Sequence, residues 1–297
     1  MQDAYLGCLF GLAVGDAIGT SVEFRYPGTF EPVTDMLGGG AFNLKAGEWT
    51  DDTSMALCLA QSLLSRKGFD PQDQMQRYLA WRHSGYMSSN GECFDIGNTT
   101  SAALDVYEAT GEPYVGLSHS RSAGNGSIMR LAPIPMYFIG SEDLELHAAN
   151  SSKTTHAHPD CIAACIVLSN ILKGLLLGDS KEYAIRSSIT GSLNITNKIK
   201  DIVLNKTYVT STSIAGTGYV VESLEAALWA FTRGSSFKEC VLLAVNLGND
   251  ADTTAAVTGQ LAGAFYGYNS IPEQWVSKIA KFELIERIAS ELFEQHK

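Results

Sequence analysis

Two short clusters of carboxylates and hydroxyls stand out in this sequence of 297 residues. One spans residues 49–53 (WTDDT), and the other spans residues 248–254 (GNDADTT). Carboxylate and hydroxyl oxygens are hard ligands, and neither cluster contains Cys or His, so the pair predicts a site for Mg²⁺ or Mn²⁺ rather than Zn²⁺. Thr and Asp are also ordinary helix-capping residues, and Asp in a first turn favours the helix dipole. Capping explains either cluster alone, whereas the two together favour a metal site.

Five further segments with polar residues fall at predicted helix ends. They are residues 15–19 (GDAIG) with the nearby Glu23, 94–98 (FDIGN), 124–127 (GNGS), 156–159 (HAHP) and 216–219 (GTGY). Loops and element ends on a rigid scaffold commonly carry functional side chains. We therefore expect these segments to share one cleft.

Three side chains in these segments admit either a chemical role or an ordinary structural one. Glu23 follows an apolar helix and is interpreted as a metal ligand or a general base, with a surface glutamate as the alternative. Asp95 precedes a predicted helix start, where a helix cap is the alternative. Tyr219, at another helix start, is placed to stack on an aromatic base, and ordinary packing is the alternative.

The glycine-containing segment 124–127 is a candidate phosphate site. Backbone N–H groups of such a turn, at the start of a helix, can cradle a phosphate. No strand precedes the segment and its glycine spacing is neither that of a Walker loop nor that of a dinucleotide fingerprint, so a plain turn is the alternative. His156 and His158 could donate hydrogen bonds to a phosphate or a ribose, or simply cap the helix that follows; their spacing is not that of a zinc protease.

The composition predicts one large domain that does not bind long nucleic acid. Hydrophobic residues make up 45% of the chain and no Pro, Ser or charge run marks a linker, so residues 1–297 are expected to form a single domain. The net charge is -11, and the Lys and Arg residues form no stripe that could follow a phosphate backbone. A small anion remains compatible, because helix N-termini and divalent cations neutralise phosphates without many basic residues.

The cysteines and the N-terminus indicate the cellular compartment of the protein. Six Cys occur without a CxxC pair and mostly within apolar helical patterns, as expected of buried free thiols in a reducing compartment. The N-terminus lacks the basic stretch of a signal peptide, and charged residues interrupt the longest apolar runs. We therefore expect a cytoplasmic protein without membrane spans, and we expect it to be a monomer.

Nearly every periodic segment predicts a helix, so the expected fold class is all-α. In the first predicted helix, residues 4–22, a glycine recurs at every fourth position from 7 to 19, and this ridge without side chains requires another element to pack closely against it. Residues 207–213 alone favour a short strand or an extended loop. Further helices are expected at about residues 50–68, 72–84, 97–109, 126–138, 142–153, 159–177, 219–232, 236–247, 252–267 and 283–295.

In this order the segments resemble the ADP-ribosylglycohydrolase family, and in particular its bacterial branch, typified by the dinitrogenase-reductase-activating glycohydrolase. The resemblance runs from about Ala4 to Gly267. Its most specific elements are residues 15–23, 49–53, 124–130, 156–159 and 246–259. One variation is visible, since Asn249 occupies a position that is often glycine in the family.

The resemblance implies a compact, single-domain, orthogonal helical bundle with two Mg²⁺ or Mn²⁺ ions at the floor of a cleft. The residues implied as ligands of these ions are Thr50, Asp51, Asp52, Asp250, Asp252 and Thr253. Those implied to contact the substrate are Asn98, Gly124, Asn125, Gly126, Ser127, His156, His158 and Tyr219. Glu23 and Asp95 would be the catalytic carboxylates, with Asp95 close to the scissile ribose.

The function implied is hydrolytic removal of ADP-ribose from a modified protein side chain, with N-linked arginine favoured. The ions would bind ribose hydroxyls and orient water, while a carboxylate handles the proton. Two alternatives stay open: an O-linked substrate, either serine or O-acyl-ADP-ribose, and a non-catalytic, crystallin-like relative that binds ADP-ribose. The expected partner is therefore an ADP-ribosylated protein or ADP-ribose itself.

Overall fold

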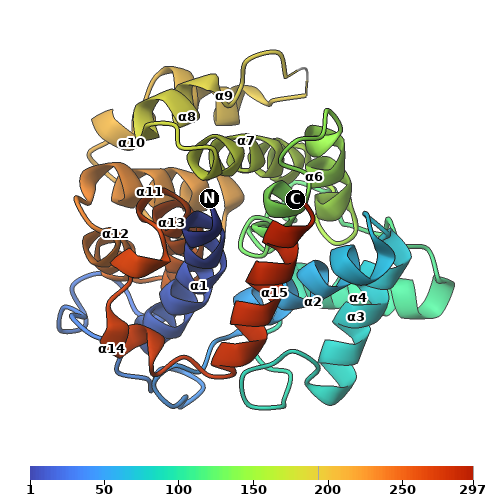
Figure 1. Cartoon of the computed structure of the whole chain (residues 1–297), viewed down its shortest axis with the longest axis horizontal. Coiled ribbons are helices and arrows are strands. Elements are labelled where there is room, and N and C mark those ends of the chain that lie inside the picture. The colour runs from blue at the N-terminus through green and yellow to red at the C-terminus, as the bar shows by residue number, and fades with distance from the viewer. Residues whose placement is uncertain (193, 297) are drawn as a thin grey trace.

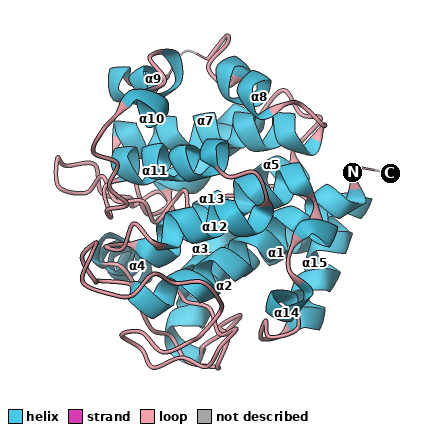
Figure 2. Ribbon diagram, turned by 90° about the vertical axis from the view of Figure 1, so that its left-hand side faces the viewer, coloured by secondary structure: helices cyan, strands magenta, loops and turns pink. Residues whose placement is uncertain are grey.

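Helices joined by loops make up the structure. The computed structural model describes residues 1–192 and 194–296, and within these ranges it contains helices and no β-strand. Figure 2 shows this composition, with helices in cyan and loops in pink. The prediction of an all-α fold is therefore confirmed.

Helices α1 (Gln2–Gly19) and α13 (Ala251–Tyr266) lie side by side at the centre (Figure 1). At each of the four ridge glycines of α1, an added Cβ would lie 2.1–2.4 Å from a carbonyl oxygen of α13. Gly259 and Gly263 of α13 approach α1 in the same way. Cβ atoms essentially never come closer to other atoms than 3.0 Å, so only glycine permits this contact. The predicted close packing against the ridge is confirmed.

The remaining helices surround this pair. Helices α12 (Phe237–Val245) and α11 (Val220–Arg233) pack on α13, and α15 (Phe282–Glu294) packs on both α1 and α2 (Asp51–Arg66). The other elements are α3 (Pro71–Ser84), α4 (Asn98–Thr110), α5 (Pro133–Tyr137), α6 (Leu144–Lys153), α7 (Pro159–Leu176), α8 (Lys181–Ser187), α9 (Asn197–Leu204), α10 (Thr207–Thr210), α14 (Glu273–Val276) and the 3₁₀ turns η1 (Thr20–Val22) and η2 (Tyr268–Ser270).

Two segments are long and apolar enough to span a membrane by length and composition alone. They are α1 continued by η1, and α7. Both are mostly buried inside the protein: the buried share of the most apolar stretch is 89% in the first segment and 78% in the second. A helix that is apolar nearly all round is typical of a protein core, and α7 meets this expectation by packing against α6, α8 and α11.

Two secondary-structure predictions are wrong for at least part of their segments. The pattern of residues 207–213 predicts a short strand or an extended loop; residues 211–213 lie in a loop, but Thr207–Thr210 form the single turn of α10. β-branched residues favour a strand only where another strand pairs with them, and none of the described residues supplies one. The pattern of residues 126–138 predicts one helix, but residues 126–130 form turns and α5 begins at Pro133. Proline has no N–H to continue a helix and is favoured at a helix start.

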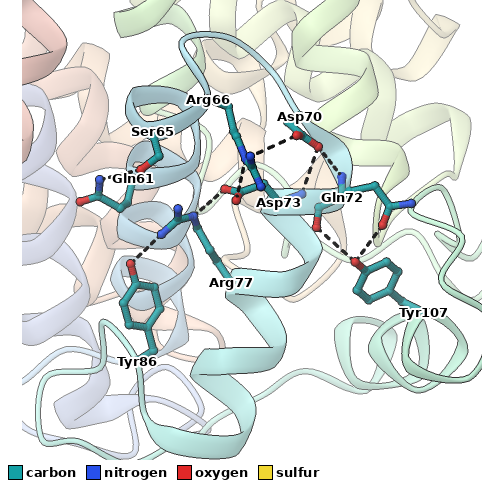
Figure 3. A network of polar contacts seen from close by, with 9 residues as sticks. All are labelled: Gln61, Ser65, Arg66, Asp70, Gln72, Asp73, Arg77, Tyr86 and Tyr107. Carbon is teal, nitrogen blue, oxygen red and sulfur yellow. Dashed lines mark hydrogen bonds and ion pairs between the residues drawn. The ribbon is translucent and has the colours of Figure 1, made fainter.

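A polar network fastens α3 to α2 and to α4 (Figure 3). Asp73 of α3 accepts hydrogen bonds from Arg66 Nε of α2 at 3.0 Å and from Arg77 Nε at 2.6 Å. Tyr107 of α4 donates its hydroxyl hydrogen to Gln72 Oε1 at 2.9 Å. Burial opposes ionisation of Asp73, but the bonds from its arginine neighbours hold its pKa below the ordinary value. The network thus anchors the C-terminal end of α2, whose first turn carries an acidic cluster.

We expect Gly11→Ala to lower the free energy of unfolding by about 3 kcal/mol, because the new Cβ would lie 2.2 Å from the Gly259 carbonyl oxygen and force two core helices apart. Gly140→Ala is the matched control: a Cβ there meets open space, so its effect stays within about 0.5 kcal/mol. Urea unfolding followed by circular dichroism measures both changes. Equal midpoints for the two variants would contradict the role of the ridge.

Candidate active site

A buried aspartate of α1 fixes the first acidic cluster. Asp16 is 0% exposed, and its Oδ1 accepts hydrogen bonds from the N and the Oγ1 of Thr50, both at 2.9 Å. Its Oδ2 accepts from Thr53 N at 3.0 Å and from Thr53 Oγ1 at 2.6 Å. Asp16 therefore caps α2 from outside that helix. No role is predicted for Asp16 from sequence; the available signal is a lone carboxylate in a glycine-ridged apolar helix.

Neither acidic cluster serves as an ordinary helix cap. Thr50 and Asp250 stand at the N-cap positions of α2 and α13, and neither side chain makes a capping hydrogen bond. Gly97, rather than Asp95, is the N-cap residue of α4. Glu23 is buried, at 5% exposure, rather than on the surface. The structure therefore excludes side-chain capping by these residues and a surface position for Glu23, while Asp51, Asp52 and Asp252 do lie in first helical turns.

The carboxylates of the two clusters meet at one place. Two groups of three residues each bring one oxygen per residue within 4.8 Å of one another: Asp51, Asp52 and Asp252, and Glu23, Asp95 and Asp252. Asp252 belongs to both groups. An added Cβ on Gly19 would lie 2.5 Å from Asp252 Cα, so the last ridge glycine lets the start of α13 reach this position.

The remaining predicted ligands lie in the same place. Thr50 Oγ1 and Thr253 Oγ1 each lie 3.3 Å from Asp52 Oδ2. Asp250 accepts a hydrogen bond from Asn125 Nδ2 at 2.7 Å, so this carboxylate connects the cluster to the glycine loop. The structure thus brings together all six residues predicted to bind metal, and the two predicted catalytic carboxylates lie beside them.

Three carboxylate oxygens of the cluster, on Asp52, Asp252 and Glu23, are buried without a hydrogen-bond partner among the described residues. Buried charges in proteins are normally paired or bound to metal. Burial first, and repulsion among the carboxylates second, raise the pKa of Asp52 and of Asp252 well above the ordinary value and that of Glu23 to about 10. Hard oxygen donors with this uncompensated charge fit a divalent cation such as Mg²⁺ or Mn²⁺.

A cavity of about 970 Å³ opens over the cluster. The predicted site residues that line it are Glu23, Asp51, Asp95, Asn98, Gly124, Asn125, Gly126, His156, Tyr219, Asp250, Asp252 and Thr253. Thr50, Asp52 and Ser127 are buried behind this lining. His158 also lies outside it: its Nδ1 accepts a hydrogen bond from Asp160 N at 3.1 Å and caps α7. Of the two histidines, His156 is the one at the cavity.

The glycine loop 124–127 forms a wall of the cavity together with His156. A Cβ on Gly126 would lie 2.8 Å from His156 Cε1, and a Cβ on Gly124 would lie 3.3 Å from His156 Nε2. The missing side chains therefore let the imidazole ring lie against the loop. Turns follow the loop instead of the predicted helix, so the loop does not itself form a helix N-terminus. An anion at this wall would meet individual N–H donors.

The hydroxyl group of Tyr219 holds this side chain in place. It donates a hydrogen bond to Asp160 Oδ2 at 3.2 Å and accepts one from Lys198 Nζ at 2.8 Å. The residue also forms an isolated antiparallel bridge with Gly124, which ties it to the glycine loop. Tyr219 is only partly buried and lines the cavity, so it is placed to contact a ligand.

Three non-glycine residues that line the cavity have left-handed backbone: Phe24, Asp95 and Asn249, with φ angles of 61°, 60° and 56°. Such strain commonly collects at functional sites. Two backbone bonds hold the conformation, from Phe24 N to Asn249 O and from Asn249 N to Arg25 O, both 2.7 Å. Asparagine tolerates this conformation better than most residues, which explains how it can stand where glycine is common.

Comparisons with known proteins agree with one another. The family model for ADP-ribosylglycohydrolase matches residues 1–297. The chain is 42% identical over 295 residues to ADP-ribosylarginine hydrolase Tri1 of Serratia proteamaculans, covering 98% of this chain and 79% of that protein. It is 33% identical over 284 residues to ADP-ribosyl-[dinitrogen reductase] glycohydrolase of Rhodospirillum rubrum, covering 94% and 91%. A solved structure of an ADP-ribosylglycohydrolase-related protein complex has a TM-score of 0.89 and 42% identity, covering 100% of this chain and 99% of that chain.

Burial of His156 predicts a specific pH dependence of stability. Burial, together with the nearby charge of Arg130, lowers the pKa of His156 to about 3, whereas an unfolded histidine titrates near 6.5. Between pH 7 and pH 5 the unfolded state therefore binds a proton that the folded state refuses, so the free energy of unfolding falls. We expect wild type to lose about 2 kcal/mol more than His156→Gln over this range. Denaturant titrations at the two pH values measure the difference, and parallel losses would contradict a neutral buried ring.

Proposed function

This chain belongs to the ADP-ribosylglycohydrolase family, and from that premise we propose that it is a divalent-metal-dependent hydrolase that releases ADP-ribose from modified arginine side chains. Its named relatives are ADP-ribosyl glycohydrolases, and the chain is an enzyme of that type. The names of these relatives refer to ADP-ribosylated arginine and to ADP-ribosylated dinitrogen reductase. This supports an ADP-ribosylated protein as the substrate.

The observation that carries the proposal is the buried acidic cluster at a cavity walled by the glycine loop. Three of its oxygens have no hydrogen-bond partner among the described residues, which supports a bound cation. A divalent ion held by these carboxylates would supply Lewis-acid polarisation of ribose hydroxyls and water. The loop 124–127 and His156 offer N–H donors suited to a pyrophosphate, and Tyr219 offers a ring to adenine.

Asp95 and Glu23 are the proposed proton-transfer groups. Both line the cavity. Burial first, and the charge of Asp16 second, raise the pKa of Asp95 to about 7, close to the value that suits acid–base catalysis near neutral pH. As the C1–N bond of the ribose breaks and a water oxygen bonds to C1, a carboxylate accepts the proton that water loses. It then gives that proton to the departing guanidine nitrogen, so the products are free ADP-ribose and arginine.

An aromatic and acidic cavity mouth favours arginine over serine as the modified residue. Phe24 and Tyr26 line the cavity with Glu23 and Asp95, and they are 63% and 73% exposed. A guanidinium is a planar cation that stacks on aromatic rings and pairs with carboxylates, whereas an O-linked serine is neutral. An O-linked substrate is the second candidate, because the acidic floor and the glycine wall would hold its ADP-ribose in the same way.

We expect the protein with Mg²⁺ or Mn²⁺ to release ADP-ribose from arginine-linked peptides about ten times faster than from serine-linked peptides. Asp252→Asn removes the carboxylate that both acidic groups share, so it should lower kcat by about 100-fold or more. Asp105→Asn, at an exposed aspartate of α4, is the matched control and should leave kcat unchanged. Chromatography of released ADP-ribose gives the rates. Failure to cleave either linkage would refute the proposed activity. Cleavage of the serine-linked peptides alone would mean that serine, rather than arginine, is the modified residue of the substrate.

Metal binding has a readout independent of activity. We expect Mg²⁺ to raise the melting temperature of wild type by about 5 °C, because an ion that binds only the folded state stabilises it, and Asp252→Asn should lose this rise. In EDTA, Asp252→Asn should be at least as stable as wild type, because it removes one of several mutually repelling carboxylates. Scanning calorimetry measures all four states. A wild-type melting temperature that changes with neither Mg²⁺ nor Mn²⁺ would contradict the metal site.

The aromatic mouth can be tested separately. Phe24→Ala should raise the KM for an arginine-linked peptide by about tenfold and leave a serine-linked peptide nearly unaffected, because only the guanidinium stacks on the ring. Leu37→Ala is the control: Leu37 is 66% exposed and does not line the cavity, so neither KM should change. Steady-state kinetics on the two peptides decides. A similar rise in KM for both linkages would remove Phe24 as a specificity residue.

A further inference from the structure

A fully buried arginine lies behind the glycine wall in contact with neutral groups. Arg130 is 0% exposed, and its Nη2 donates hydrogen bonds to Thr155 Oγ1 at 2.7 Å and to Ser151 O at 3.3 Å. Its Cζ lies 4.8 Å from the ring centre of Tyr78. Burying a cation among neutral acceptors is costly, so an arginine at such a position calls for an explanation beyond packing.

Thr155 connects this arginine to the cavity. Its Oγ1 lies 2.7 Å from Arg130 Nη2 and 2.8 Å from His156 Nδ1. A guanidinium can only donate, so the hydroxyl oxygen accepts from Arg130, and its own hydrogen is left to be donated. Nδ1 of His156 is the acceptor placed to receive it. A neutral imidazole that accepts at Nδ1 carries its proton on Nε2.

We propose that Arg130 is a positioning residue that acts through the Thr155 hydroxyl to hold His156 as the Nε2–H tautomer, so that His156 presents a hydrogen-bond donor to a phosphate at the glycine loop. The nature of the ligand rests on the proposed function, whereas the tautomer is inferred from the contacts that Thr155 makes with Arg130 and His156. Arg130 itself does not line the cavity.

The orientation of the His156 ring determines where the Nε2–H group of this tautomer lies. Nε2 is the ring nitrogen that lies against Gly124 and Gly126, at 3.3 Å and 3.1 Å from the positions that Cβ atoms would occupy. An Nε2–H group there adds a donor to a wall that is not itself the start of a helix, and donors aimed at an anion bind it strongly. The opposite tautomer would turn a lone pair toward phosphate oxygens, which repels them.

The charge of Arg130 also keeps the ring neutral. An imidazolium would carry a second positive charge into the same buried region, and burial and Arg130 together depress the pKa of His156. The same tautomer therefore persists over the whole neutral range. His158 differs on this point, because its Nδ1 accepts a backbone N–H at a helix start instead of a side-chain hydroxyl.

The tautomer can be read directly from ¹⁵N NMR of labelled wild-type protein, with the His156 signals assigned by their loss in His156→Gln. We expect a protonated Nε2 and an unprotonated Nδ1 at pH 7, with shifts that do not change down to pH 5. Thr155→Ser and Arg130→Lys keep a hydroxyl and a cationic donor and should keep this pattern. Thr155→Val and Arg130→Met should shift His156 toward a mixture of tautomers.

Affinity supplies the second readout. Thr155→Val should weaken binding of ADP-ribose by about tenfold, the scale of one lost hydrogen bond to a charged group, whereas Thr155→Ser should stay within about twofold of wild type. Thr154→Val is the matched control: its Oγ1 also faces Arg130 Nη2, at 3.5 Å, but makes no bond to His156. It should bind ADP-ribose within about twofold of wild type. Isothermal titration calorimetry measures all four proteins.

A wild-type spectrum with the proton on Nδ1, or with a charged ring at pH 7, would overturn the proposal, and that spectrum requires no variant to fold. Unchanged ADP-ribose affinity in folded Thr155→Val would overturn the link to ligand binding. Failure of the proposed function looks different. In that case His156 would show the expected tautomer while neither arginine-linked nor serine-linked substrates released ADP-ribose.

Discussion

The backbone contact between α1 and α13 is the constraint on which the rest of the structure depends. The acidic groups come from residues 23–95 and 250–252, and the close contact of α1 with α13 helps to bring these parts of the chain together. Asp16 then extends the effect from α1 to the start of α2. Protein interiors are densely packed and transmit displacements, so the spacing of these helices sets the spacing of the carboxylates. The ridge is therefore part of the site although it lies beneath it.

The acidic cluster opposes folding, and other parts of the protein must offset its cost. Burial first, and repulsion among the carboxylates second, raise the pKa values of Asp51, Asp52 and Asp252 well above the ordinary value. The large apolar core and the network that joins α3 to α2 and α4 stabilise the same region. In carboxylate-rich metal proteins, the clustered carboxylates typically destabilise the folded state when no cation is bound and stabilise it once a cation binds.

Much of this arrangement could be predicted from sequence, because it depends on residue types at short spacing. The period of the apolar residues predicts the long helices, the i,i+4 glycines predict a close helix contact, and the two Asp/Thr clusters predict a shared site. The role of Asp16 could not be predicted, because its partners in α2 are distant in sequence and only the fold supplies them. The division of labour between His156 and His158 was equally hidden, since both precede the same helix and ring direction decides between them. The short strand or extended loop predicted at 207–213 is wrong for Thr207–Thr210, where no strand among the described residues is present to pair with the segment. The helix predicted at 126–138 is wrong before Pro133, where proline decides the helix start.

The glycine ridge also has a thermodynamic consequence. A contact made of backbone against backbone has no rotamers to freeze, so the two helices reach a single relative position during folding and keep it. The ordering that a flexible loop would require at the moment of binding has already taken place. Under the proposed function, an incoming ion or ribose would meet carboxylates whose main chains are already immobile, and little of its binding free energy would be lost to conformational entropy.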